Sequence, residues 1–266
     1  MAITALHTAA TGMQALSTKI DVIANNIANA DTPGYKASRA NFQDLLYQIR
    51  SQPGVQTGTD TNSPLGTQIG LGVAMSNTQL LFTQGSAMQT GLGLDAMIQG
   101  DGFFQVELPG GGTGYTRAGN FVLAPDGQIV LGNSQGFRLK DGPSVPSDVS
   151  WDKVSISSDG QVVASRADGS IESLGQLQLA RFPNPSGLLQ NGSNVYLQSG
   201  ASGEPIEGIP GENGLGTILP RSLELSTTEA VNELVELIKT QRVFQMNSQS
   251  IQTADEALQT VATLRR

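Results

Sequence analysis

The sequence predicts an α+β protein: N- and C-terminal coiled-coil-like helices packed together, an extended connecting region, and a β-rich hairpin domain in the middle. Three observations support this fold class. Apolar residues recur every seven positions at both ends of the chain, Asp-Gly and Asn-Gly dipeptides recur through the middle, and a polar stretch lies between the first helix and the middle.

The first element is a helix over residues 1–31. Two apolar series, three positions apart, define its seam: Leu6, Met13, Ile20 and Ile27, then Ala9, Leu16, Ile23 and Ala30. A seam sustained over more than three heptads is typical of coiled coils. Only Gly12 interrupts it, at about 1 kcal/mol relative to alanine. Pro33 and Gly34 are expected to end the segment.

The connecting region covers residues 32–75. Its central part, residues 48–68, is rich in Gln, Thr, Ser, Gly and Pro, which favours a linker or an extended arm.

The middle of the chain, residues 76–210, is predicted to be a β domain. Asp-Gly occurs at 101–102, 126–127, 141–142, 159–160 and 168–169, and Asn-Gly at 191–192 and 213–214. Both dipeptides tolerate positive φ and are strong hairpin-turn signals. Short alternating runs such as 103–108 and 174–182 flank several of them, as expected for strands. Residues 211–227 form the return connection.

The last element is a helix over residues 228–266. Ser226 and Glu229 have the spacing of a capping box. Leu237, Phe244, Ile251 and Leu258 recur every seven residues, with Leu234, Ala254 and Val261 three positions away and polar Thr240 and Asn247 in equivalent places. The seam therefore has the same character as that of the first helix.

Composition excludes several classes of function. The net charge of −8 argues against a nucleic-acid partner and against an anionic membrane surface. The absence of cysteine excludes disulfides and thiolate metal sites. No window is apolar enough for membrane insertion, and residues 1–18 lack the features of a cleaved signal peptide, which leaves other export routes open.

No pattern supports catalysis. His7 is the only histidine, so a Ser-His-Asp or His-metal scheme would depend on it alone. The Asp-Gly aspartates each lie in their own turn, and residues 91–102 lack a nucleotide-binding glycine pattern. Tyr115, Arg117 and Phe121 are candidate ligand contacts, with packing inside the β domain as the favoured alternative. We predict no enzyme, no cofactor and no metal site.

The terminal helices are interpreted as assembly elements. A lone pair of helices, each with one wet face, is marginally stable, and burial against neighbouring subunits would add apolar contacts. The predicted inter-subunit packing residues are Leu6, Met13, Leu16, Ile20, Ile23, Ile27, Leu234, Leu237, Phe244, Ile251, Leu258 and Val261. The predicted register-setting polar contacts are Asn25, Asn26, Asn29 and Asn247. The alternative is an antiparallel pair that packs within one chain.

Three segments carry a resemblance to a known family. The stretches "NNIANADTPGYK" (25–36), "GDGFFQVELPGG" with "GYTRAGNFVLAPDGQIV" (100–130), and "ELVELIKTQRVFQMNSQSIQTADEALQTV" (233–261) resemble signatures of the bacterial flagellar rod and hook family. Together they cover both ends and the body. The segment 45–73 is similar to the arm of the branch that forms the distal rod, whereas the opening "AITALHTAATGM" departs from that branch.

The resemblance implies a structural subunit of a helical homopolymer. Its terminal helices would line an axial channel, and its arm would contact neighbouring copies. The residues that the resemblance assigns to this arm are Tyr47, Gln48, Arg50, Gln52, Pro53 and Gly54. It also implies proximal rod and hook-side axial proteins and surrounding ring proteins as partners, with type III export into the periplasm and no cleaved signal. The alternatives left open are another axial protein of the family and a secreted β-domain binder or enzyme with clamping helices.

Overall fold

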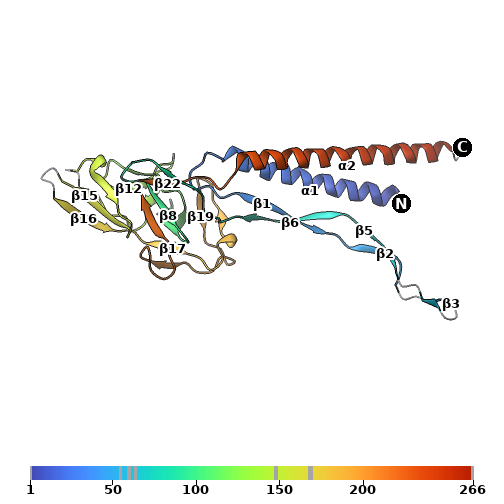
Figure 1. The fold of residues 1–266 in the computed structure, drawn as a ribbon, viewed down its shortest axis with the longest axis horizontal. Coiled ribbons are helices and arrows are strands. Elements are labelled where there is room, and N and C mark those ends of the chain that lie inside the picture. The colour runs from blue at the N-terminus through green and yellow to red at the C-terminus, as the bar shows by residue number, and fades with distance from the viewer. Residues whose placement is uncertain are drawn as a thin grey trace. The chain divides into compact units, whose positions relative to one another are not determined.

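The structure is a computed structural model that describes residues 2–53, 56–58, 61–62, 65–146, 149–166 and 170–264. The fold is α+β, as predicted, with terminal helices packed together and β structure between them (Figure 1). The chain divides into two compact units. Unit 1 comprises Met1–Ala28, Ser38–Gln79 and Ala230–Arg266, and unit 2 comprises Asn29–Ala37 and Leu80–Glu229. The five-part division made from the sequence is finer and stays a prediction.

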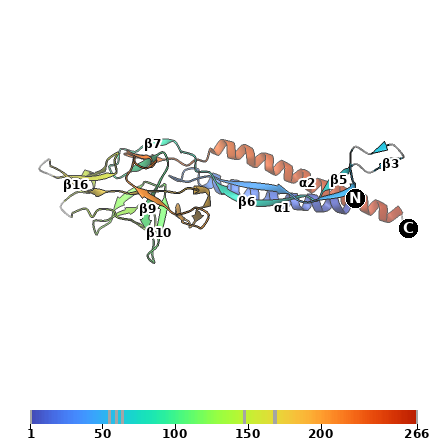
Figure 2. The same ribbon diagram turned by 90° about the horizontal axis from the view of Figure 1, so that it is seen from below.

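Unit 1 contains the two helices, α1 (Ala2–Ala28) and α2 (Ala230–Leu264). They run antiparallel, because Gly12 lies beside Asn247 whereas Asn26, further along α1, bonds Glu233, which comes earlier on α2. The strand β1 lies alongside α1 as well (Figure 1 and Figure 2). The heptad series therefore produces a helix pair within the chain, and one side of α1 also contacts a β ribbon.

The capping-box prediction is wrong. Helix α2 begins at Ala230, so Ser226 stands too far upstream to act as its N-cap. The Ser226 hydroxyl instead accepts a hydrogen bond from the Thr228 amide at 3.2 Å, a local turn that competes with helix capping.

The strands of unit 1 form narrow two-stranded ribbons. They are β1 (Ser38–Asp44) with β6 (Val73–Leu80), β2 (Tyr47–Ser51) with β5 (Thr67–Gly70), and β3 (Gln56–Gly58) with β4 (Thr61–Asn62). The polar stretch predicted to be a linker or an extended arm is therefore a β hairpin in its described part.

Unit 2 contains a nine-stranded sheet, a three-stranded sheet and two strand pairs. The nine-stranded sheet runs β11-β12-β13-β9-β10-β19-β18, with β17 also beside β9 and β20 beside β17. Its strands are β9 (Phe103–Glu107), β10 (Thr113–Thr116), β11 (Phe121–Leu123), β12 (Ile129–Leu131), β13 (Arg138–Leu139), β17 (Leu179–Arg181), β18 (Leu189–Gln190), β19 (Val195–Leu197) and β20 (Ile206–Gly208). The three-stranded sheet is β14 (Val154–Ile156), β15 (Gln161–Ser165) and β16 (Ile171–Gln176). The pairs are β8 (Ala96–Gln99) with β21 (Thr217–Pro220) and β7 (Ala87–Gln89) with β22 (Ser222–Glu224), and short 3-10 turns cover Trp151–Lys153 and Pro185–Gly187.

Three of the turn dipeptides form hairpins as predicted. Asp126-Gly127 joins β11 to β12, Asp159-Gly160 joins β14 to β15, and Asn191-Gly192 joins β18 to β19, with each glycine at positive φ. Two others do not. Asp101-Gly102 and Asn213-Gly214 follow strands that pair with partners distant in sequence, because β8 pairs with β21 and β20 pairs with β17.

For the two remaining dipeptides, the described residues show no hairpin. Asp141-Gly142 turns the chain just after β13, which pairs with strands that precede it. Asp168-Gly169 lies outside the described residues.

Unit 2 holds the main apolar core. Its larger cluster is built from buried residues of both sheets, such as Phe104, Leu131, Val154 and Leu179, and of the β8–β21 pair, such as Ile98. A smaller cluster is aromatic: Phe103 meets Phe82 and Phe182 edge to face, with ring centroids 5.4 and 5.9 Å apart. Although aromatic residues make up only 5% of the chain, several of them gather around Phe103, whose ring lies beside Arg117.

Gly72 is a close-approach point in unit 1. Its φ is +119°, and a Cβ placed there would lie 2.2 Å from Thr11 Oγ1 and 3.5 Å from Thr8 Cα on α1. The neighbouring Leu71 carbonyl also lies 3.3 Å from His7 Nδ1. The β ribbon can therefore lie against α1 only if residue 72 lacks a side chain.

We expect Gly72→Ala to lower the free energy of unfolding by about 1–3 kcal/mol, because alanine is strained at this φ and meets Thr11. Urea unfolding measures the loss. Gly112→Ala is the matched control, since nothing lies within 4 Å of a Cβ there and its φ is not positive. Equal stability of the two variants would contradict the close approach.

Candidate functional site

The predicted seam residues pack mainly within one chain. Ile23 is buried, and those that are half-buried are Leu6, Met13, Leu16, Ile20, Ile27, Leu237, Phe244 and Ile251. Leu234 and Leu258 are exposed, and the side chain of Val261 lies outside the described residues. The contacts described are those of a single subunit, so packing of these residues between subunits stays a prediction.

Asn26 connects three elements of unit 1 through hydrogen bonds of its side chain. Its buried side-chain amide donates to the Ser38 carbonyl at 2.9 Å and to Glu233 Oε1 at 3.1 Å, and its oxygen accepts the Ser38 amide at 3.0 Å. One side chain therefore fixes α1 against both α2 and the start of β1. Mutual pairing of this kind sets helix register within the subunit.

The other predicted register asparagines occupy different surroundings. Asn29 follows α1 and accepts a hydrogen bond from the Thr32 hydroxyl at 3.2 Å, whereas Asn25 is exposed. Asn247 is half-buried, and its Nδ2 would stand 3.1 Å from a Cβ at Gly12. Gly12 therefore makes room for Asn247 at the helix interface. A register role for these residues between copies stays a prediction.

We expect Asn26→Ala to destabilise unit 1 by about 1–3 kcal/mol, because the part-buried Ser38 amide loses its acceptor and the buried Asn26 side chain loses its contacts. The measurement is urea unfolding followed by helical circular dichroism. Gln14→Ala, at an exposed position of the same helix, should change stability by less than about 0.5 kcal/mol. A loss in Gln14→Ala as large as that in Asn26→Ala would remove the specific role of Asn26.

Two carboxylates of α2 face α1 in contrasting environments. Glu236 accepts a hydrogen bond from Lys19, and this contact lowers the pKa of Glu236. Burial instead raises the pKa of Glu233, although the hydrogen bond from Asn26 opposes the shift. Both residues bridge the same two helices and therefore reinforce the antiparallel register.

The opposite face of α2 carries an exposed apolar stripe, which we call the outer stripe: Val231, Leu234, Val235, Ile238 and Met246. Val231 is 73 % exposed, and the spacings of four and seven residues to Val235 and Ile238 place all three on one helix face. That face lies away from Thr240, which is buried in the helix interface. Contiguous exposed apolar surface of this kind marks an interaction site.

Helix α2 also extends beyond its partner. Asn247 lies level with Gly12, so the residues beyond roughly position 257 have no described α1 residue beside them. Leu258, a seam residue, is accordingly 38 % exposed. The final turns of α2 thus continue the seam without an intramolecular partner among the described residues.

The arm exposes large apolar side chains as well. Tyr47, Ile49, Leu46 and Leu65 are all exposed, and the β2–β5 pairing sets Tyr47 opposite Gly70. The predicted arm residues Gln48, Arg50, Gln52 and Pro53 are exposed too, and Gly54 lies outside the described residues. A two-stranded hairpin with this exposure gains little stability by itself.

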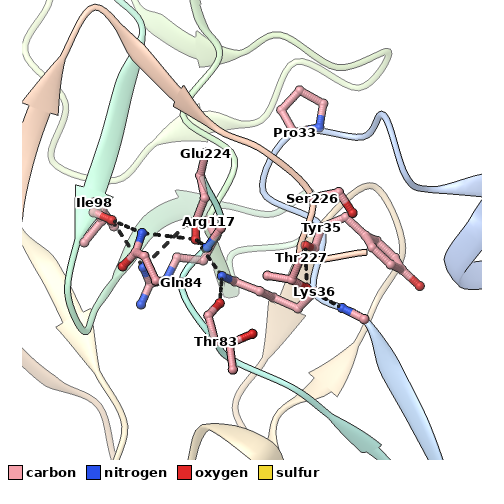
Figure 3. Close-up of polar contacts among 12 residues, drawn as sticks. Pro33, Tyr35, Lys36, Thr83, Gln84, Ile98, Arg117, Glu224, Ser226 and Thr227 are labelled. Carbon is pink, nitrogen blue, oxygen red and sulfur yellow. Dashed lines mark hydrogen bonds and ion pairs between the residues drawn. The ribbon is translucent and has the colours of Figure 1, made fainter. Parts of the chain in front are cut away.

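Unit 2 contains a buried ion cluster centred on Glu224 (Figure 3). Glu224 Oε1 accepts hydrogen bonds from Lys36 Nζ at 2.7 Å, the Gly85 amide at 2.8 Å and Gln84 Nε2 at 3.2 Å. Lys36 also donates to the Thr83 carbonyl at 2.6 Å. The side chains of Lys36 and Glu224 are 1 % and 0 % exposed, so this pair is removed from solvent.

Arg117 completes the cluster with a looser contact. Its Nη1 lies 3.7 Å from Glu224 Oε2, and its guanidinium stands 5.2 Å from the centre of the Phe103 ring. Burial lowers the pKa of Lys36 and of Arg117, while the Glu224 carboxylate opposes both shifts. A buried charge set of this kind is stable only while every partner is present.

The cluster connects segments that are far apart in sequence. The Gly34 amide donates to the Glu224 carbonyl at 2.7 Å, and the Thr227 amide donates to the Tyr35 carbonyl at 3.1 Å. A Cβ at Gly34 would meet the backbone of Ala118 at 2.6 Å. Three segments therefore lie against one another: 33–37, 117–119 and 222–227. This packing gives the "PGYK" and "TRAG" stretches a structural role within unit 2.

Sequence reasoning missed Lys36 and Glu224. The available signal was one charged residue, Lys36, Arg117 or Glu224, inside each of three otherwise weakly charged stretches. No local spacing links these three residues. Tyr115 and Phe121, proposed as ligand contacts or core residues, are buried in the core of unit 2. His7 lies on α1 beside the Leu71 carbonyl.

The described residues form neither a metal-binding group nor a membrane-spanning helix. In the parts of the chain that the structure describes, no His, Cys, Asp and Glu side chains group in a way that would hold a metal ion. Within the same ranges, neither helix combines the length and the apolar character needed to cross a membrane.

Comparison with known families covers both ends and the middle of the chain. Residues 6–36 match the family described as "Flagella basal body rod protein" and residues 97–164 match "Flagellar hook protein FlgE/F/G D1 domain". Residues 220–264 match "Flagellar basal body rod FlgEFG protein C-terminal". These matches contain the seam, the buried ion cluster residues Lys36, Arg117 and Glu224, and the outer stripe.

Known proteins match over nearly the whole chain. The flagellar basal-body rod protein FlgG of Caulobacter vibrioides is 42% identical over 98% of this chain and 99% of its own length. FlgG of Borreliella burgdorferi is 39% identical over 98% of both chains. The flagellar hook-basal body complex protein FlhP of Bacillus subtilis is 30% identical over 97% of this chain and 98% of its own. The similarity covers nearly the whole chain at about 40% identity and includes the three stretches that resemble signatures of this family. The chain therefore belongs to the flagellar basal-body rod protein family, a family of structural proteins.

Proposed function

We propose that the chain is the subunit of the distal rod and polymerises into a rigid helical tube. The tube acts as a drive shaft that transmits motor torque to the hook and encloses the export channel. The observation that carries this proposal is the outer stripe of α2, because its apolar side chains remain about half or more exposed to solvent among the described residues, although α1 already occupies the opposite face.

The outer stripe favours assembly through copies of the same chain. A helix that is apolar on two opposite faces needs a neighbour on each, and α1 supplies only one. The overhanging Leu258 and the exposed apolar residues of the arm add surface that neighbouring copies would cover. Each subunit would then contact its neighbours through the outer stripe, the end of α2 and the arm, and repeated contacts of these three kinds support a stiff shaft.

The partners follow from the place of the subunit in the flagellum. We infer contacts with proximal rod proteins at one end, with hook-side axial proteins at the other, and with ring proteins around the shaft. Delivery by the type III export apparatus without a cleaved signal would bring the subunit to the periplasm.

Electron microscopy of the purified, concentrated protein tests the proposal. Tubes or ordered helical oligomers are the expected result. A monomer that stays compact at every concentration would contradict polymerisation and would favour the alternative of a β-domain binder whose helices only clamp its own fold.

A further inference from the structure

Unit 2 contains a cavity beside the ion cluster that the assembly of the tube does not account for. Its volume is about 250 Å³, and its walls include Phe103, Phe182, Pro183, Arg117, Arg181 and Asp101. Aromatic rings and prolines supply the apolar part of the lining, and charged side chains supply a polar part of similar extent. This combination is typical of binding sites for small organic groups.

Arg117 is buried and incompletely paired. Its Nε has no hydrogen-bond partner among the described residues, and its closest approach to Glu224 is the 3.7 Å contact with Oε2. The other oxygen, Oε1, already accepts three hydrogen bonds. The guanidinium thus retains unused donors although it lines a cavity, and an unpaired buried donor is costly.

Arg181 lines the same cavity with a second unused donor. It ends β17, it is half-buried, and its buried Nε also has no partner among the described residues. Its Nη1 would stand 2.9 Å from a Cβ at Gly214, so this glycine leaves room for the guanidinium. Arg117, which directly follows β10, and Arg181, at the end of β17, therefore line one cavity.

We propose that this cavity binds a carboxylate monoanion between Arg117 and Arg181. Guanidinium groups match planar carboxylates in geometry, and the apolar walls would strengthen the pairing. The local charges are Lys36, Arg117 and Arg181 against Glu224 and Asp101, which leaves room for one more negative charge. Asp101 at the wall disfavours a doubly charged phosphate through like-charge repulsion.

The carboxylate has two possible sources with the same chemistry. It is either a free organic acid or a Glu or Asp side chain of a neighbouring protein in the assembly. The apolar rings favour a ligand whose carboxylate is attached to an apolar body, so benzoate is a suitable probe and acetate a minimal one.

The test uses the free full-length subunit and the Nε–H NMR resonances of its arginines. Benzoate and, more weakly, acetate are expected to shift the Arg117 and Arg181 resonances saturably, whereas phosphate binds at least about tenfold more weakly. Arg181→Met should weaken benzoate binding about tenfold or more. Arg138→Met, which removes an exposed arginine that pairs with Asp126 instead, is the control and should leave binding unchanged.

A second measurement separates the two sources. If assembled tubes exclude benzoate that the free subunit binds, the carboxylate comes from a neighbouring protein; if both forms bind it, the ligand is a small molecule. Unmoved Arg117 and Arg181 resonances at saturating benzoate, or equal shifts with benzoate, phosphate and chloride, would overturn the inference. Because the first measurement needs no polymer, its failure leaves the proposed tube untouched.

Discussion

Glu224→Leu is expected to lower the free energy of unfolding of unit 2 by about 3–5 kcal/mol. The substitution leaves the ammonium of Lys36 and the guanidinium of Arg117 buried with no carboxylate between them. It also removes the acceptor of the Gly85 amide and one of the two acceptors of Gln84 Nε2, which keeps its bond to the Ile98 carbonyl. Urea unfolding followed by near-ultraviolet circular dichroism measures the loss.

A second variant shows that the loss comes from the unpaired charges. Lys36→Met combined with Glu224→Leu removes both members of the close pair, so the double variant should be more stable than Glu224→Leu alone. Arg138→Gln, which breaks an exposed pair with Asp126, should cost less than about 1 kcal/mol. If Glu224→Leu cost no more than Arg138→Gln, the ion cluster would not hold the three segments together.

Ile238→Asp is expected to raise the critical concentration for polymerisation at least about 100-fold. Ile238 is 51 % exposed in the subunit, so covering its exposed part contributes roughly 1 kcal/mol to each contact. Burying a carboxylate in its place costs at least about 2 kcal/mol more. Each 1.4 kcal/mol corresponds to about tenfold in concentration. Sedimentation of tubes at increasing protein concentration measures the effect.

The free subunit should be unaffected by this change, because Ile238 is exposed on the face of α2 opposite the buried Thr240. The control is Gln241→Asp, which introduces the same charge at an exposed polar position nearby on α2. Loss of helical content in unassembled Ile238→Asp would contradict the assignment of the outer stripe as surface. Equal polymerisation of the two variants would contradict its role in assembly.

The elements governed by local spacing were predicted from the sequence. The heptads of Leu6 and Leu237 predicted two helices that pack together, and Asp126-Gly127 predicted a hairpin whose register the structure confirms. In both cases the residues that form each helix or hairpin are close in sequence.

The hairpin predicted at Asp101-Gly102 is wrong, because the buried strand β8 pairs with β21, more than 100 residues later in the chain.

The buried ion cluster could not be predicted in the same way. Lys36, Arg117 and Glu224 are separated by at least 80 residues each, and no periodicity relates them. Apart from Leu234, which the heptad pattern assigns to the seam, the outer stripe was missed for a different reason. The seam accounted for the apolar residues of one face of α2, and Val235 and Ile238 fall outside that heptad series. The helix start at Ala230 was missed because Ser226 bonds locally to Thr228.

Oxidation of Met246 by peroxide, compared between free subunits and assembled tubes, tests the central claim most directly. Met246 belongs to the outer stripe and is exposed in the subunit, whereas Met97 is buried in unit 2 and reports the protected limit in both states. If neighbouring copies cover the outer stripe, sulfoxide formation at Met246 should slow at least about tenfold on assembly, toward the rate of Met97. Oxidation of Met246 in intact tubes at the rate of the free subunit would contradict the account.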